Sequence, residues 1–162
     1  MRTDNRKVRG IIVSVYFVLV VFAIVLATVF SAFGDLTENL GRTLSIIFMA
    51  FVGLFLLVYL ISRYFEYDSD GVKVIVVNKG LLLGDYLNYR EYKIEFLKKN
   101  LKGYKFKNYL IYKVLKLVVL HSNGKIKRHT FNITLVKKKK RKYIKTSLSK
   151  ILRDNAKTNT NT

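Results

Sequence analysis

Two uncharged stretches decide how this chain is organised. Residues 10–34 read GIIVSVYFVLVVFAIVLATVFSAFG, and residues 43–62 read TLSIIFMAFVGLFLLVYLIS. Neither stretch contains Asp, Glu, Lys, Arg or His. A helix needs about 20 apolar residues to cross the roughly 30 Å hydrocarbon core of a bilayer. The sequence therefore predicts two transmembrane helices, over residues 10–34 and 43–64, joined by a short loop at residues 35–42.

The charges that flank these stretches predict their orientation. Residues 1–9 carry four cations and one carboxylate, whereas the loop at residues 35–42 carries one cation and two carboxylates. The chain after residue 63 is again strongly basic. Because short segments rich in Lys and Arg stay in the cytoplasm, we expect both termini inside and the loop outside.

A secretory signal peptide is the alternative interpretation of the first stretch. Its basic start fits a signal peptide, but its apolar run is much longer than the 7–15 residues or so of a signal core. No small-x-small cleavage site follows it, since Phe30 stands where a small residue would be needed. The pattern favours a helix that stays in the mature protein.

Composition narrows the classes of function. The chain has 30 Lys and Arg against 10 Asp and Glu, a net charge of +20, and no Cys. The absence of Cys excludes disulfides and thiolate metal sites. Ionisable groups inside the spans, the usual mark of pumps and transporters, are absent from the sequence. No Gly-rich phosphate loop, nucleophile elbow or zincin motif occurs, so we expect no enzyme, no cofactor and no metal.

Beyond the second stretch the pattern becomes typical of strands. Asp68–Gly71 is a turn signal, and the β-branched run Val72–Val77 that follows predicts a strand. Arg90–Lys98 and Gly103–Asn108 alternate as strands do, whereas Leu81–Tyr89 fits no single pattern.

A β-hairpin is predicted around Asn123-Gly124, because this pair between two strand-like runs favours a type I′ turn. A two-residue turn would place Leu120 opposite Lys127 and Val118 opposite His129. In that register the two histidines, His121 and His129, lie on different faces of the hairpin. With no carboxylate beside them they are not expected to bind a metal.

An amphipathic helix is predicted over Thr134–Arg153, with Thr134 as a possible N-cap. Its apolar face is expected to contain Val136, Tyr143, Ile144, Leu148, Ile151 and Leu152. The polar tail at residues 156–162 is expected to be disordered.

The expected fold is α+β, with a two-helix transmembrane hairpin and then a curled antiparallel sheet of 5–7 strands capped by one C-terminal helix. Element order over residues 65–155, with Tyr67–Gly71 and Phe131–Thr134, resembles the small bacterial membrane proteins that carry a pleckstrin-homology-like domain. We expect a location in the bacterial inner membrane. The resemblance implies about seven strands and a binding role. It transfers no ligand, because Asp68, Asp70 and Lys73 replace the basic signature of phosphoinositide-binding loops.

A run of six cations is the candidate site for anions or lipid. Its members are Lys137, Lys138, Lys139, Lys140, Arg141 and Lys142. Six consecutive helical residues wrap more than one turn, so they cannot all face one way. Near an anionic leaflet each cation contributes about 1 kcal/mol. The alternative is a solvated helix face in a Lys-rich chain.

The sequence is compatible with three functions. The preferred one is a membrane-anchored cytoplasmic interaction or scaffold domain without catalytic activity. The second is a sensor of anionic lipid surfaces that acts through the basic run, and the third is an unrecognised membrane enzyme. Expected partners are membrane lipids and an acidic protein. Nucleic acid is not favoured, because the interleaved Tyr and Lys residues between Tyr86 and Tyr112 form no recognition motif.

Overall fold

The computed structural model describes residues 2–32, 39–81 and 91–160. It divides the chain into two compact units. Unit 1 comprises Met1–Arg6 and Arg63–Thr162, and unit 2 comprises Lys7–Ser62. Most of the ambiguous segment Leu81–Tyr89 and half of the predicted outer loop, residues 35–38, lie outside the described residues.

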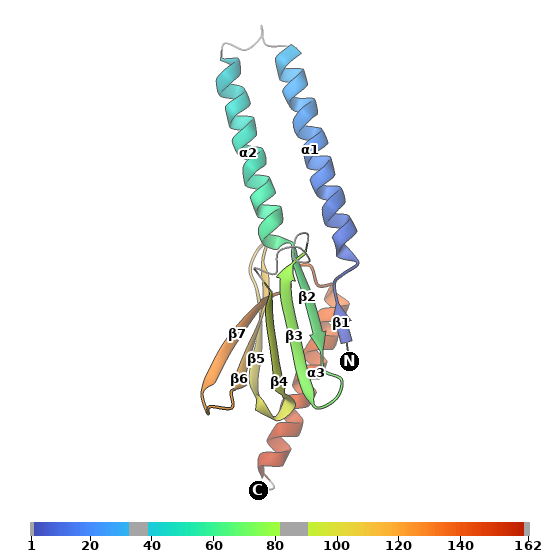
Figure 1. Cartoon of the computed structure of the whole chain (residues 1–162), viewed down its shortest axis with the longest axis vertical. Helices are drawn as coiled ribbons and strands as arrows, with labels where there is room; N and C mark the ends of the chain where they lie inside the picture. The colour runs from blue at the N-terminus through green and yellow to red at the C-terminus, as the bar shows by residue number, and fades with distance from the viewer. Residues whose placement is uncertain (1, 33–38, 82–90, 161–162) are drawn as a thin grey trace. The chain divides into compact units, whose positions relative to one another are not determined.

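Unit 2 consists of two long apolar helices, α1 (Val8–Ala32) and α2 (Leu40–Ile61) (Figure 1). Val8–Ala32 and Gly41–Ile61 are both long and apolar enough to cross a bilayer, which confirms the predicted pair of apolar helices. In the most apolar 18-residue stretch of each helix, only 6% is buried. A core helix of a water-soluble domain would be mostly buried instead.

The two helices contact each other through aromatic side chains. The rings of Tyr16 and Phe55 lie 5.4 Å apart, and those of Phe22 and Phe51 lie 6.0 Å apart. The Tyr16 hydroxyl donates a hydrogen bond of 3.4 Å to the carbonyl of Phe55. Aromatic pairs at such separations add about 0.5–1.5 kcal/mol beyond area burial.

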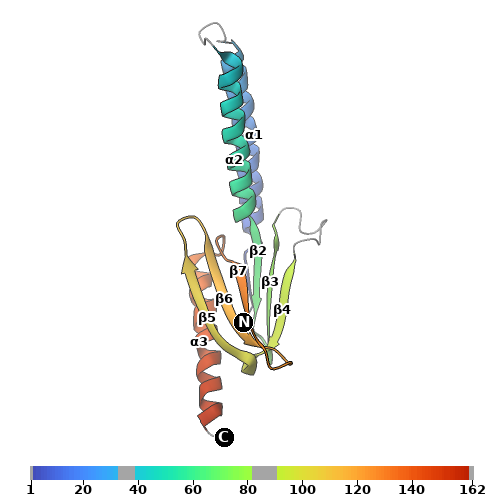
Figure 2. The ribbon, with the colours of Figure 1, turned by 90° about the vertical axis from the view of Figure 1, so that its left-hand side faces the viewer.

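Unit 1 contains two antiparallel sheets and one C-terminal helix (Figures 1 and 2), so the expected α+β class is confirmed. The four-stranded sheet has the order β1 (Arg2–Asp4), β2 (Arg63–Asp68), β3 (Lys73–Gly80) and β4 (Tyr92–Leu97). A short 3-10 helix, η3 (Lys98–Asn100), leads to the three-stranded sheet β5 (Leu101–Asn108), β6 (Lys113–Leu120) and β7 (Ile126–Asn132). The chain then forms helix α3 (Lys138–Thr160).

Strand β1 was not predicted, because the basic flank at residues 1–9 was expected only to set the orientation of the hairpin. Instead, Arg2 pairs with Asp68 and Asp4 with Glu66, so the N-terminal residues form the edge of the first sheet. The Arg2 Nε donates to a Glu66 carboxylate oxygen at 2.7 Å. A strand of three residues is too short to show an alternation of apolar and polar side chains. Its partner strand also lies about sixty residues further along the chain, so no local pattern indicates the pairing.

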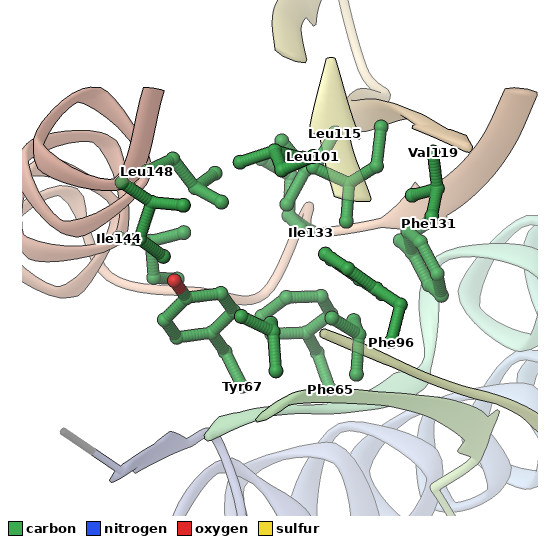
Figure 3. Close-up of a cluster of buried hydrophobic side chains, with 14 of the residues drawn as sticks. Phe65, Tyr67, Phe96, Leu101, Leu115, Val119, Phe131, Ile133, Ile144 and Leu148 are labelled. Carbon is green, nitrogen blue, oxygen red and sulfur yellow. The ribbon is translucent and has the colours of Figure 1, made fainter. Parts of the chain in front are cut away.

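The core lies between the two sheets and α3. Phe65 and Tyr67 of β2 are fully buried, as are Leu115 of β6 and both Ile144 and Leu148 of α3. In Figure 3 the two α3 side chains project into the space between the sheets, above the rings of Phe65 and Tyr67. Helix α3 therefore covers the open side of the core, which is the place that the amphipathic pattern predicted for it.

Helix α3 begins later and ends later than predicted. The Thr134 hydroxyl is not an N-cap, because its oxygen accepts the N–H of Lys113 at 3.0 Å, and the helix begins only at Lys138. Tyr143 does not join the buried face and is 46% exposed. The expected disordered tail is helical through Thr160, and the Asn155 amide donates to the carbonyls of Lys98 and Leu101.

The predicted β6–β7 hairpin is present, but its register differs from the prediction by one residue. Leu120 pairs with Ile126 and Leu117 with His129, so the turn is longer than the two residues expected. The N–H of Gly124 donates to the carbonyl of His121 at 3.0 Å, and Gly124 has a φ of 73°. Asn123 does not adopt a positive φ, which a type I′ turn requires. The turn is therefore of the three-residue kind, which ends in a left-handed glycine.

A basic groove and a histidine pair

Backbone hydrogen bonds bring the start of α3 to the end of the β5–β6 hairpin. The N–H of Ile133 donates to the carbonyl of Lys113 at 2.9 Å, and the Lys113 N–H donates to the Thr134 hydroxyl. These bonds fix the segment before α3 against the first residue of β6. The cations that begin the helix therefore lie beside the last residues of β5.

An open groove with a volume of about 760 Å³ lies at this junction. We call it the basic groove. Its lining residues are Phe106, Asn108, Lys113, Lys138, Lys139, Arg141, Lys142 and Lys145. Among the described residues, the lining holds six cations and no carboxylate. Its volume falls within the range of about 300–1,000 Å³ that is typical of small-molecule sites.

Four of the six cations singled out in the sequence line this groove. They are Lys138, Lys139, Arg141 and Lys142. Lys137 precedes the helix, and its carbonyl accepts the N–H of Arg141 at 3.0 Å. Lys140 is directed elsewhere, since its ammonium donates to the backbone carbonyl of Asp4.

Two lining cations lie outside the predicted run. Lys145 lies seven residues after Lys138, so helical periodicity places it on the same face. Lys113 comes from the start of β6, and no local pattern connects it with α3. Only the backbone bonds between residues 113 and 133–134 place it in the groove.

Among the described residues, no carboxylate forms an ion pair with a cation of the groove. Within the described ranges, ion pairs join Arg2 to Glu66 and Lys73 to Glu95, and neither pair includes a groove cation. The Nε of Arg141 is buried and has no hydrogen-bond partner among the described groups. Cations four residues apart repel each other, and cations in the first turn of a helix oppose its dipole. A bound anion would relieve both effects.

The two histidines contact each other, contrary to the sequence prediction that they lie on different faces. Their Nε2 atoms are 3.1 Å apart, and the Tyr92 hydroxyl is hydrogen-bonded to the Nδ1 of His129. The one-residue difference in register explains this result, because it moves His129 to the face of the hairpin on which His121 lies. The described part of the chain holds no group of three or more His, Cys, Asp or Glu side chains that could bind a metal.

Burial lowers the pKa of His129 below its ordinary value, and the positive charges of His121 and Lys127 act in the same direction. Tyr92 of β4 faces it from the other sheet. In the interval between the lowered pKa and about 6.5, the unfolded chain binds more protons than the folded one. We therefore expect unit 1 to lose stability as the pH falls through that interval.

This expectation is testable by urea unfolding of unit 1 in the full chain, in detergent, at pH 7.5, 6.5 and 5.5. The urea concentration at the unfolding midpoint should decrease as the pH is lowered. The substitution His129→Gln should remove most of that pH dependence. Glu95→Gln is the control, because Lys73 lowers the pKa of Glu95 and its contribution is lost only below about 4.5. An unchanged pH dependence in His129→Gln would contradict the role of this histidine.

Comparisons of the chain with protein families, with curated proteins and with solved structures find no match. No relative supplies a function. A functional assignment therefore rests on the geometry of unit 1 and on the composition of unit 2.

Proposed function

We propose that this chain is a membrane-anchored interaction protein, without catalytic activity, whose unit 1 binds anionic lipid headgroups through the basic groove. The observation that carries the proposal is the gathering of six cations in one open groove that contains no carboxylate. An anionic surface is the partner that such a charge distribution favours.

The place of the groove in unit 1 favours lipid over an acidic protein. The chain enters unit 1 at Arg63, which pairs with Gly80 at the end of β3 remote from Lys73. The ammonium of Lys140, in the first turn of α3, donates to the carbonyl of Asp4, just before the chain leaves unit 1 at residue 6. The groove thus lies at the end of unit 1 that is covalently connected to the apolar helices. If those helices span a bilayer, headgroups lie within reach of this end.

We further propose that both termini are cytoplasmic, in the inner membrane of a bacterium. The pairing of β1 with β2 supports a common side for the two flanks of the apolar helices, because paired strands cannot be separated by a bilayer. Cleavage of α1 as a signal peptide would remove β1 from the sheet. The basic flanks favour the cytoplasmic side.

A pleckstrin-homology-like fold is the finer assignment that we propose for unit 1. Two antiparallel sheets followed by a C-terminal helix support it, as does the insertion of Ile144 and Leu148 between the sheets. Strand β1 would be an addition at the edge. The proposed fold agrees with a binding role.

The lipid proposal is tested with the full chain in nanodiscs of phosphatidylcholine mixed with phosphatidylglycerol. Native mass spectrometry counts the phosphatidylglycerol molecules that stay bound. The test variant replaces Lys138, Lys139, Arg141 and Lys142 by Gln. We expect anionic lipid retention to fall by about tenfold or more, because four contributions of about 1 kcal/mol far exceed the 1.4 kcal/mol that corresponds to tenfold.

The matched control removes the same charge from the opposite end of unit 1, by replacing Lys99, Lys102, Lys125 and Lys127 with Gln. Lys99 lies in η3, Lys102 lies at the start of β5, and Lys125 and Lys127 lie at the β6–β7 turn, away from the groove. The control should retain anionic lipid as the wild type does. Equal losses in both variants would mean that net charge acts without the groove, and no loss in either would leave an acidic protein as the partner.

A further inference from the structure

The tip of the β5–β6 hairpin, residues 109–112, is a continuous exposed apolar segment. Leu110 is 100% exposed, Ile111 54%, Tyr109 51% and Tyr112 39%. The N–H of Tyr109 donates to the carbonyl of Tyr112 at 2.7 Å, and this bond closes the turn. The two tyrosine rings lie 6.4 Å apart at the base of the turn, with Leu110 and Ile111 between them in the chain.

The composition of this tip is unusual for a turn that faces water. Turns favour Gly, Asn, Asp, Ser and Pro, and the other hairpin of the same sheet follows the rule with Ser122-Asn123-Gly124. The tip contains none of these residue types. Turn chemistry therefore does not explain Leu110 and Ile111, and their exposure in water is unfavourable.

Two cations flank the apolar tip. Lys107 and Lys113 lie on the strands that lead into and out of it, and Lys113 also lines the basic groove. The order from the tip inward is thus aliphatic, aromatic and cationic. A bilayer surface offers the matching order of hydrocarbon, interface and anionic phosphate, with Tyr enriched at the interface.

The tip also lies at the end of unit 1 where the chain continues from the apolar helices. Val72 and Lys98 are hydrogen-bonded near the start of β5, and the tip is at the other end of that strand (Figure 2). Arg63, where the chain enters unit 1, is likewise at the end of the first sheet away from Val72. The tip, the basic groove and the connection to the apolar helices therefore share one end.

We propose that the hairpin tip inserts into the lipid leaflet, with Leu110 and Ile111 in the acyl region and Tyr109 and Tyr112 at the headgroups. The inference rests on the proposed function for the membrane that it enters, and it adds a second contact of a different kind. The groove provides charge and the tip provides apolar insertion. Membrane attachment that combines an apolar element with a basic patch is stronger than either element alone.

The chain offers a clean test because it contains neither Cys nor Trp. The variant Leu110→Cys is labelled with the environment-sensitive dye NBD, and the full chain is reconstituted in vesicles of phosphatidylcholine and phosphatidylglycerol. Val72→Cys is the control, since Val72 is 73% exposed and lies at the opposite end of unit 1. Both positions are exposed, so the label should leave the fold intact.

We expect the emission at position 110 to shift to the blue, to brighten severalfold and to be quenched by lipid that carries a doxyl group on its acyl chain. The label at position 72 should behave as in water. Identical, water-like signals at both positions would overturn the proposal. A blue-shifted signal at position 110 that acyl doxyl does not quench would also overturn it, because the tip would then be covered by protein.

The same label separates this proposal from that of the groove. In the groove variant with four Gln substitutions, and in pure phosphatidylcholine, the tip should still report insertion if it acts through apolar contact. If insertion fails while phosphatidylglycerol retention depends on the groove, only the inference about the tip is wrong. If insertion holds while retention is unchanged in the groove variant, only the proposal for the groove is wrong.

Discussion

Replacing Phe131 by Ala is expected to lower the free energy of unfolding of unit 1 by about 3–5 kcal/mol, the usual range for removing a buried aromatic ring. Phe131 is fully buried. Its ring lies 6.4 Å from that of Phe65 on β2 and 5.4 Å from that of Tyr92 on β4, so it joins β7 of the second sheet to the first sheet. The substitution would leave a cavity at the junction of the two sheets.

Pulse proteolysis of the full chain in urea, in detergent micelles, measures this loss. Many of the possible cleavage sites of a protease specific for Lys and Arg lie in unit 1. Ile126→Ala on the same strand is the matched control, because Ile126 is 61% exposed and its truncation should cost about 0.5 kcal/mol or less. Equal shifts of the two midpoints would mean that the junction of the sheets does not depend on Phe131.

Local pattern predicted most of the elements of unit 1. The β-branched run after Gly71 became β3, with Val74 and Val76 buried in alternation. Helical periodicity correctly placed Ile144 and Leu148 in the core. These predictions succeed because one buried face imposes a fixed period on the sequence.

The register of the β6–β7 hairpin could not be predicted. The pair Asn123-Gly124 indicated a two-residue turn, and the error of one residue placed the two histidines on different faces. Their contact follows from the register, which the turn sets through a left-handed Gly124. A turn dipeptide predicts that a hairpin exists better than it predicts the length of the turn.

The sequence predicted only part of the candidate site. A run of cations is evident in any sequence, but which of them share a groove depends on where the helix begins. The helix was predicted to begin at Thr134, whereas the Thr134 hydroxyl is held by Lys113 and the helix begins at Lys138. Lys113 lines the groove because of the same hydrogen bond to Thr134, which joins residues far apart in the sequence.

Asn5→Ala is expected to cost about 2–4 kcal/mol of the stability of unit 1, although the residue lies in a flank that the sequence marked only by its charge. Asn5 is 3% exposed. Its side-chain oxygen accepts the N–H of Phe65 at 2.8 Å, and its amide nitrogen donates to the carbonyl of Arg63 at 2.9 Å. Alanine would leave the buried N–H of Phe65 unpaired, at a cost of about 1–3 kcal/mol, and the partly buried carbonyl of Arg63 unpaired, at about 1 kcal/mol.

Hydrogen exchange of the full chain, measured by mass spectrometry, reports this change locally. Protection should fall at Arg2–Asp4 and at Phe65, where β1 meets β2. Asn123→Ala is the control: its side chain also accepts a backbone N–H, that of Lys125 at 3.1 Å, but in an exposed turn where water can replace it. If the two variants lose protection and stability equally, β1 is not held by Asn5. If only Asn5→Ala loses protection and stability, the side chain of Asn5 joins the segment that precedes α1 to the segment that follows α2. Those two segments would then move as one element of unit 1.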